Sequence, residues 1–263
     1  MSIAKLASGA QPVIYEQNGV LSLRFGLGGA VQSEMHVDSP DLLMLDYTRM
    51  MMAFLLFIER PRHIGMIGLG GGSIHKHCYR YLRDTQISVA EISSEIIALR
   101  NKFVIPNDDH RFKVTCEDGA EFVKRHPSQF DVLIVDGFDV RGQPPQLCTQ
   151  NFYDDCYRAL AREGMLIANL CDPFPRILVR RMRECFGHRV LTVDVEDSTN
   201  MIVLAAKGNV WEKSDTQLRR NRTQILEHHS IDFRRAVEEL VSERESRHRA
   251  RPTKALTELC QDS

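Results

Sequence analysis

Residues 63–73, HIGMIGLGGGS, decide the fold of this chain, because an apolar run there leads directly into a cluster of glycines. The apolar run, 63–69, has the composition of a buried strand, and a helix-like stretch follows the glycines as far as Arg83. Glycines at a strand-to-helix turn let the backbone approach a ligand closely, and the helix N-terminus offers unpaired amide donors. Close packing of a strand against a helix is the alternative explanation of such a turn.

Strand-like and helix-like segments alternate along the chain after this turn. This alternation is typical of βαβ units and predicts an α/β fold with a mostly parallel sheet that helices cover on both faces. The last two strands are joined by a short polar turn and are expected to form an antiparallel hairpin. The expected strands cover residues 63–69, 86–92, 112–116, 131–135, 165–170, 188–194 and 201–206.

The two ends of the chain differ in composition from this alternating region. Residues 11–40 have the pattern of short strands and turns and are too few to bury a core of their own, and 41–59 have helical spacing. Beyond Gly208 charged residues dominate, apart from one amphipathic helix with Phe233, Ala236, Val237, Leu240 and Val241 on one face. We therefore expect a short β segment (1–40), an α/β domain (41–208) and a charged helical extension (209–263).

Composition excludes several classes of protein. Of the 263 residues, 43% are hydrophobic and 26% charged, which argues against a disordered chain or a coiled coil. The formal net charge is -1, so no overall attraction to nucleic acid or to an anionic membrane is expected. The 7 cysteines form no Cys-x-x-Cys pair, and no apolar run approaches the ~20 residues of a membrane span. These features predict a cytoplasmic protein.

Acidic residues follow the next two strands at the points where they end. Glu91 ends the second strand, where a carboxylate can accept both hydroxyls of a ribose. Asp118, followed by Gly119, ends the third strand, where it can accept a hydrogen bond from an adenine amino group. The alternatives are helix caps, by Glu91 ahead of Ser94 and by Asp118. Glycines and two acids at three successive strand ends indicate a nucleoside site.

The fourth strand ends with a further pair of acids, Asp136 and Asp139. Ligands of open α/β sheets bind at the carboxyl edge of the strands, where these two residues are expected. The loop that follows, VRGQPPQLCTQNFY, contains Pro and Gly and is suited to folding over a substrate. The alternatives are a turn at Asp136-Gly137 and a solvent-facing Asp139.

No metal site is expected from the sequence. The stretch 75–78, His-Lys-His-Cys, resembles a ligand set, but histidines at His-x-His spacing point to different faces of a helix. A surface helix with a buried Cys78 is the simpler interpretation.

In this order, the motifs resemble the spermidine synthases and their bacterial paralogues, which have the Rossmann-like, class I AdoMet-dependent methyltransferase fold of seven strands. The similarity extends from about Gln32 to Ala206. The residues that carry it are Tyr47 in LDYTRMM, the glycines of GLGGGS, Glu91 in AEIS, Asp118 in EDGAEF, and Asp136 with Asp139 in VDGFDVRGQPP.

The resemblance implies transfer of an aminopropyl group from decarboxylated AdoMet to an amine such as putrescine, in polyamine biosynthesis, by a homodimer that needs no metal. It implies that Asp136 takes the proton of the attacking amine and that Tyr47, Asp139 and Gln32 position this substrate. The donor-binding residues that it implies are Gly68, Gly70, Gly71, Glu91, Asp118 and Gly119.

Two departures from the family pattern bear on the donor. Gly71 stands where typical members have an acid in the Gly-rich turn, and Thr48-Arg49 stands where they have an acid after the tyrosine. Loss of an acid and gain of Arg49 favour a carboxylate, as on intact AdoMet or on an amino-acid-like acceptor. Two alternatives therefore stay open, a methyltransferase that uses AdoMet and a catalytically silent nucleoside-binding paralogue.

Overall fold

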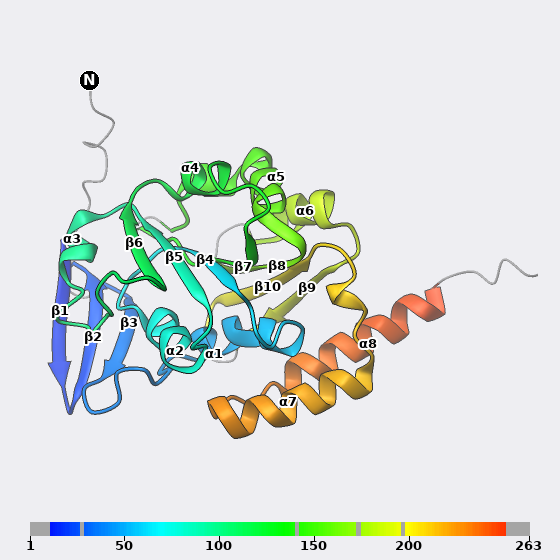
Figure 1. Ribbon diagram of the computed structural model, residues 1–263, viewed down its shortest axis with the longest axis horizontal. Helices are drawn as coiled ribbons and strands as arrows, with labels where there is room; N and C mark the ends of the chain where they lie inside the picture. The colour runs from blue at the N-terminus through cyan, green and yellow to red at the C-terminus, as the bar shows by residue number, and fades with distance from the viewer. Residues whose placement is uncertain (1–10, 27–28, 140–141, 172–174, 196–197, 251–263) are drawn as a thin grey trace, which may run out of the picture.

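A computed structural model describes residues 11–26, 29–139, 142–171, 175–195 and 198–250, with side chains as far as Ser242. Its centre is a seven-stranded sheet with the strand order β6-β5-β4-β7-β8-β10-β9 (Figure 1). The strands are β4 (His63–Ile67), β5 (Gln86–Glu91), β6 (Phe112–Cys116), β7 (Phe130–Val135), β8 (Leu160–Cys171), β9 (Val190–Asp194) and β10 (Asn200–Ala206).

The pairing of these strands confirms the predicted fold class. The strands β6, β5, β4, β7 and β8 pair in parallel, while β10 runs antiparallel to both of its neighbours, β8 and β9. The expected terminal hairpin is therefore present, with β10 inserted between β8 and β9. The order reverses between β4 and β7, which places a switch point beside the Gly-rich turn, where ligands of such sheets bind.

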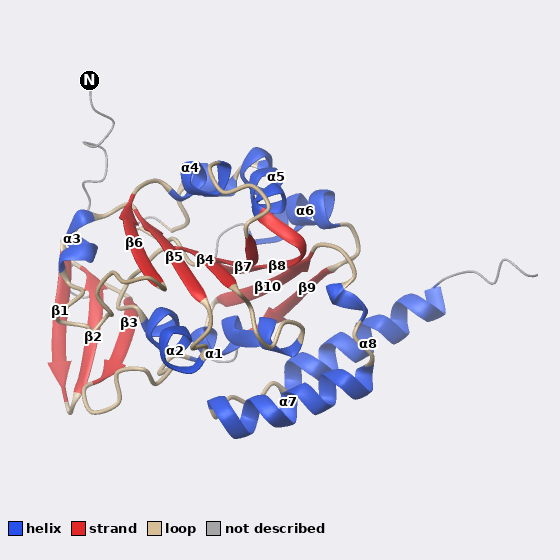
Figure 2. Ribbon diagram, viewed as in Figure 1, coloured by secondary structure: helices blue, strands red, loops and turns tan. Residues whose placement is uncertain are grey.

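Helices cover both faces of the sheet, as Figure 2 shows. On one face lie α4 (Gly119–Lys124), α5 (Gln150–Ala159) and α6 (Pro175–Phe186), and on the other lie α1 (Asp46–Met51) and α2 (Ser73–Tyr81). Alternate residues of the strands pack into two separate hydrophobic cores, one on each face of the sheet. In β7, for example, Ile134 packs in the core next to α1 and α2, while Leu133 and Val135 pack in the opposite one.

The helix expected over 41–59 is shorter than predicted. An α-helix spans only Asp46–Met51 and continues as a 3-10 helix over Met52–Leu56. The late start coincides with hydrogen bonds from the Arg49 guanidinium to the carbonyls of Leu43 and Met44, which satisfy these groups outside a helix.

The N-terminal segment forms a three-stranded antiparallel sheet of β1 (Pro12–Gln17), β2 (Val20–Phe25) and β3 (Val31–His36). As expected, it has no core of its own: Leu21, Leu23 and Met35 are buried in the same core as α1 and α2.

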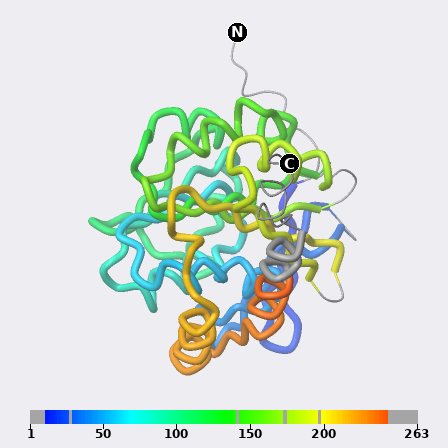
Figure 3. Tube along the Cα trace, turned by 90° about the vertical axis from the view of Figure 1, so that its right-hand side faces the viewer, coloured from blue at the N-terminus to red at the C-terminus, as the bar shows by residue number. Residues whose placement is uncertain are grey.

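The C-terminal part contains α7 (Asp215–His229) and α8 (Arg234–Ala250), which lie side by side in Figures 1 and 3. The predicted amphipathic face of α8 is confirmed, since Phe233, Ala236, Val237 and Leu240 are buried. The sequence did not predict α7, whose apolar stripe is interrupted by the buried Asn221. Asn221 donates hydrogen bonds to the carbonyl of Leu56 and to Glu59, both at 2.9 Å.

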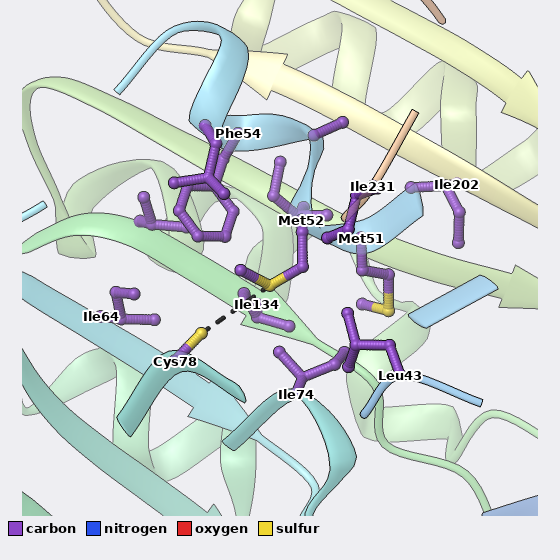
Figure 4. Packing of buried hydrophobic residues seen from close by; sticks show 14 of the residues in the cluster. Leu43, Met51, Met52, Phe54, Ile64, Ile74, Cys78, Ile134, Ile202 and Ile231 are labelled. Carbon is purple, nitrogen blue, oxygen red and sulfur yellow. Dashed lines mark hydrogen bonds between the residues drawn. The ribbon is translucent and has the colours of Figure 1, made fainter. Parts of the chain in front are cut away.

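The prediction that α2 is a surface helix is wrong. Cys78 is buried as expected, with its thiol 3.8 Å from the sulfur of Met52 (Figure 4), but His75, Lys76 and His77 are buried as well. The small sheet and α7 cover this helix, since Ser33 contacts Ser73 and His229 contacts His77. In the described part of the chain, no group of three or more His, Cys, Asp or Glu side chains is arranged to hold a metal. Over the same residues, no helix has both the length and the apolarity to cross a membrane.

Candidate active site

Backbone hydrogen bonds join the ends of four neighbouring strands into one edge. The N–H of Glu117 donates to the carbonyl of Glu91 (3.0 Å), and the N–H of Gly68 donates to that of Ala90 (2.9 Å). The N–H of Asp136 donates to the carbonyl of Ile67 (2.9 Å). The strand ends that carry the predicted residues therefore lie beside one another in the order β6, β5, β4, β7.

Two of the predicted glycines are required by packing. A Cβ at Gly68 would lie 2.3 Å from the backbone oxygen of Asp136, and one at Gly71 would lie 2.6 Å from Oγ of Ser33. Gly70 differs, because it has a φ of +51° and faces open space. The turn thus serves strand–helix packing at its ends and leaves backbone free for a ligand in the middle.

Glu91 is buried and fixed between two backbone donors. One carboxylate oxygen accepts from the N–H of Leu69 in the Gly-rich turn, and the other accepts from the N–H of Ser93, both at 2.8 Å. Burial raises the pKa of Glu91, and these N–H groups oppose the shift. The helix-cap alternative for Glu91 is wrong, because the hydroxyl of Ser93 caps α3 (Ser94–Ala98) by accepting from Ile96.

Asp118 caps a helix and also faces the loop after β7. Its Oδ1 accepts from the N–H of Ala120 at 2.7 Å, which is the N-cap of α4 that the alternative interpretation predicted. Its Oδ2 accepts from Nε2 of Gln146 at 3.2 Å. The neighbouring Gly119 is required by packing, since a Cβ there would lie 2.4 Å from Ile67.

Asp136 lies at the end of β7 between an amide and a phenol. Its Oδ1 accepts a hydrogen bond from Nδ2 of Asn169 at 2.9 Å, and the hydroxyl of Tyr47 faces the same carboxylate. Burial raises the pKa of Asp136 to about 6, against the opposing effects of Asn169 and Tyr47. Burial and the Asp136 charge also raise the pKa of Tyr47 well above its usual value. Asp136 is therefore a carboxylate with raised basicity.

For the other two predicted substrate residues, Gln32 and Asp139, the structure shows no side-chain contact with Asp136 among the described residues. The carbonyl of Gln32 accepts from the Tyr47 hydroxyl at 3.3 Å, but the Gln32 side chain donates to the nearby carbonyl of Ala30. Asp139 is exposed, and its backbone forms a turn with Gly142. Gln32 thus orients Tyr47 through its backbone.

Sequence reasoning missed three polar residues of this edge: Asn169, Asn200 and Gln146. Asn169 was detectable as the one amide in the apolar run MLIANLC, on the same face of its strand as Ile167. Gln146 and Asn200 gave no such signal, because polar residues are ordinary in a loop and at a turn.

Arg49 does not present a free guanidinium to the site. It donates to the carbonyls of Leu43 and Met44 and pairs with Asp46, so its hydrogen bonds serve the local chain. The carboxylate-binding role suggested by its place in the sequence therefore has no support from its contacts.

Comparison with known proteins agrees with this geometry. Residues 44–175 match the model of the spermine/spermidine synthase domain. A polyamine aminopropyltransferase of Neisseria meningitidis serogroup A is 34% identical over 228 residues, which are 85% of this chain and 86% of that protein. The chain belongs to the spermine/spermidine synthase family. The predicted resemblance is thereby confirmed.

Solved structures that resemble this family member support the fold. A spermidine synthase in complex with the transition-state analogue AdoDATO has a TM-score of 0.58 at 23% identity, over 74% of this chain and 73% of that one. Human methyltransferase-like protein 13 in complex with SAH has a TM-score of 0.61 at 20% identity, over 70% of this chain and 91% of that one. The synthase family and methyltransferases thus share this architecture.

Proposed function

We propose that this chain transfers an aminopropyl group from decarboxylated AdoMet to an amine such as putrescine. Aminopropyl transfer in polyamine biosynthesis follows from membership of the family, and the donor, the acceptor and the residue roles are the proposed part. In the reaction, the amine nitrogen bonds to the propyl carbon next to the sulfonium, and the carbon–sulfur bond breaks with its electron pair on sulfur. The acceptor nitrogen loses one proton of its ammonium form so that its lone pair can attack, and the other product is the neutral thioether methylthioadenosine.

Asp136 has the properties of the base in this reaction. An alkylamine has a pKa near that of Lys, ~10.4, so the acceptor arrives protonated and must lose a proton to attack. A carboxylate can attract the ammonium and then take its proton, and a pKa of about 6 makes Asp136 a stronger base than an ordinary aspartate. The hydrogen bond from Asn169 and the facing Tyr47 hydroxyl support a fixed orientation of this carboxylate.

The Gly-rich edge fits a nucleoside donor. Glu91 uses both oxygens on backbone donors, and each oxygen has a further lone pair for a ribose hydroxyl. Asp118 has an oxygen directed to Gln146 that an adenine amino group can use instead. Gly70 supplies open backbone in the turn after β4, which contacts Glu91 through the N–H of Leu69, and this supports a role of the predicted Gly68, Gly70 and Gly71 along the donor side chain.

The contacts of Arg49 favour the decarboxylated donor over intact AdoMet. A guanidinium that already binds Leu43, Met44 and Asp46 has fewer N–H groups left for a donor carboxylate. At Gly71 the space of a side chain is filled by Ser33, whose hydroxyl lies 3.2 Å from that of Ser73. The donor's ammonium would thus meet neutral hydroxyls here rather than an acid.

Product analysis tests the proposal. The purified chain is incubated with putrescine and either decarboxylated AdoMet or AdoMet, and the products are identified by mass. We expect spermidine and methylthioadenosine in equal amounts from the decarboxylated donor, and a loss of about 10²–10⁴-fold in rate for Asp136→Asn. A methylated amine formed from AdoMet would support the methyltransferase, and donor binding without turnover would support the silent paralogue.

Three further expectations stay proposals: the division into 1–40, 41–208 and 209–263, a homodimer, and a cytoplasmic location. The homodimer follows from the family resemblance and is tested by light scattering of the purified chain.

A further inference from the structure

Three polar side chains form a row across three adjacent strands at the edge described above. They are Asp136 after β7, Asn169 in β8 and Asn200 at the start of β10. Asn169 is only 3% exposed and lies in a strand that is otherwise apolar at its centre. A buried amide in such a strand calls for a specific set of partners.

Strand alternation puts the three side chains on one face. Each lies two residues from an isoleucine of the core that packs against α1 and α2: Ile134, Ile167 and Ile202 respectively. Because side chains alternate along a strand, each polar side chain lies on the same face of the sheet as its isoleucine. All three polar side chains lie nearer than the isoleucines to the carboxyl ends of β7 and β8. In the pairing of β8 with β10, Asn169 stands opposite Ile202, so Asn200 is its diagonal neighbour.

The hydrogen bonds of the row run in one direction. Nδ2 of Asn200 donates to Oδ1 of Asn169 at 2.9 Å, and Nδ2 of Asn169 donates to Oδ1 of Asp136 at 2.9 Å. A carboxylate only accepts, so Asn169 must turn its NH₂ group toward Asp136. A donor at position 200 fixes that orientation, because the Asn169 oxygen is then satisfied on the opposite side.

We propose that Asn200 is a positioning residue for the base, which holds the Asn169 amide so that its NH₂ group faces Asp136. This inference rests on the proposed role of Asp136. If the Asn169 amide turned over, its oxygen would face the carboxylate, and that repulsion would displace Asp136 and favour its protonated form. The Asp136 carboxylate and Tyr47 would then no longer be presented to the amine in a fixed geometry.

The test compares Asn200→Ala, which removes the donor, with Asn200→Asp, which replaces it by an acceptor of nearly the same shape. An aspartate at 200 accepts from the Asn169 NH₂ group and so turns the amide over. Ser198→Asp is the matched control, because it puts the same charge two residues away and its carboxylate can still accept from the Asn200 N–H, which Ser198 Oγ accepts at 3.0 Å. The groups that act on the pKa of Asp136 are Asn169 from β8 and Tyr47 from α1, and all three variants retain both.

Two readouts are followed in each variant. The first is the acid limb of kcat/KM against pH, and the second is the pH titration of the Asp136 carboxyl by ¹³C NMR, assigned with Asp136→Asn. We expect Asn200→Asp to move both midpoints upward by about one pH unit and to lower kcat about tenfold. Asn200→Ala is expected to have a smaller effect in the same direction. Ser198→Asp is expected to move the midpoints by less than a third of the shift in Asn200→Asp. Methylthioadenosine affinity should stay within about twofold of wild type, since the row does not touch Glu91 or Asp118.

Unchanged midpoints in both Asn200 variants would overturn the proposal, whether or not activity falls, because a merely structural role lowers activity without moving the titration of Asp136. An equal shift in Ser198→Asp would also overturn it, since the cause would then be charge alone. If the wild-type chain forms no aminopropylated product, the proposed function fails, and the NMR titration still decides whether Asn200 acts on Asp136.

Discussion

The side-chain amide of Gln146 donates to Oδ2 of Asp118 across 3.2 Å and so links the loop after β7 to the end of β6. This is the oxygen that we propose for the adenine amino group, which means that Gln146 competes with the nucleoside. We expect Gln146→Ala to bind methylthioadenosine about two- to fivefold more tightly, because one exposed hydrogen bond no longer has to be exchanged. Isothermal titration measures the affinity.

Gln129→Ala is a suitable control, since Gln129 is also exposed but lies before β7, at the opposite end of that strand. Weaker binding in Gln146→Ala would show that Gln146 contacts the nucleoside rather than competing with it. A titration with the deaminated analogue methylthioinosine separates the cases, because this base lacks the amino group that displaces Gln146.

Glu91 is expected to bind the ribose through oxygens that already accept from Leu69 and Ser93. A glutamine has one acceptor oxygen for two backbone donors, so Glu91→Gln should weaken methylthioadenosine binding by about tenfold or more. The exposed Glu95, on α3, provides the control Glu95→Gln, which should leave the affinity unchanged. Wild type should bind the 2′-deoxy analogue more weakly than methylthioadenosine, whereas Glu91→Gln should bind the two ligands with similar affinity. If removal of the 2′-hydroxyl weakens binding equally in both proteins, Glu91 does not contact the ribose.

The raised pKa of Asp136 predicts that its ionised form, which activity requires, lowers the stability of the fold at pH 7. A carboxyl whose pKa is about 6 in the folded chain and ~3.9 unfolded binds its proton more tightly when folded. Stability therefore falls as pH rises from about 4 to about 6, and the ionised form costs stability at pH 7. Asp136→Asn should melt higher at pH 7 by about 2–4 °C, or about 1 kcal/mol, while losing activity. Equal melting temperatures at pH 7 would contradict the raised pKa.

Arg49 is expected to stabilise the segment before α1 without selecting the donor. Arg49→Gln removes hydrogen bonds to Leu43 and Met44 and should lower the melting temperature by about 2–4 °C, or about 1 kcal/mol. The ratio of rates with decarboxylated and intact AdoMet should not change. A shift of that ratio toward the decarboxylated donor would restore the carboxylate-binding role that the sequence suggested. The exposed Arg80 gives the control Arg80→Gln.

The sequence predicted the sheet and the strand-end acids because both follow from local patterns. Alternating strands and helices predict a parallel sheet, and such a sheet brings successive carboxyl ends to one edge. Glu91, Asp118 and Asp136 lie where this reasoning puts them.

What the sequence could not predict depends on contacts between distant segments. The burial of α2 requires Ser33 and His229, which lie in segments far from it in sequence. The row from Asn200 to Asp136 requires β10 to be inserted beside β8, which no local pattern of residues encodes. The segment before α1 is held outside the helix by polar contacts such as those of Arg49 with Leu43 and Met44, whereas periodicity records only apolar spacing.

A pair of histidines attaches α7 to α2. Nδ1 of His229 lies 3.1 Å from Nε2 of His77, whose Nδ1 donates to the carbonyl of Asp41 at 3.1 Å. The ring of Tyr81 packs against both imidazoles, at centroid distances of 4.5 Å and 5.5 Å. With Nδ1 of His77 donating to a carbonyl, Nε2 of His77 accepts from Nδ1 of His229, so the His77 ring is neutral in this arrangement.

The pair should make the attachment of α7 dependent on pH. Burial lowers the pKa of His77, and burial together with the neighbouring histidines lowers that of His229 to about 4. Because both folded pKa values lie below the unfolded value of ~6.5, the pair contributes stability above about pH 6.5 and loses it as pH falls toward 4. Protonation of His77 at Nε2 also puts two donors face to face, whereas protonation of His229 leaves its Nδ1–H donating to His77.

Hydrogen exchange of the α7 amides measures this loss directly. We expect their protection to decrease from pH 6.5 to pH 4.5 by more than that of β7, by about 1 kcal/mol in opening free energy once intrinsic rates are corrected. His229→Gln should remove most of this pH dependence, whereas His228→Gln should retain most of it, because His228 is exposed on the same turn and contributes least to lowering the pKa of His229. If α7 in His229→Gln loses protection over this range as the wild type does, the acid sensitivity lies elsewhere, and the histidine pair is only a packing contact between α2 and the C-terminal helices.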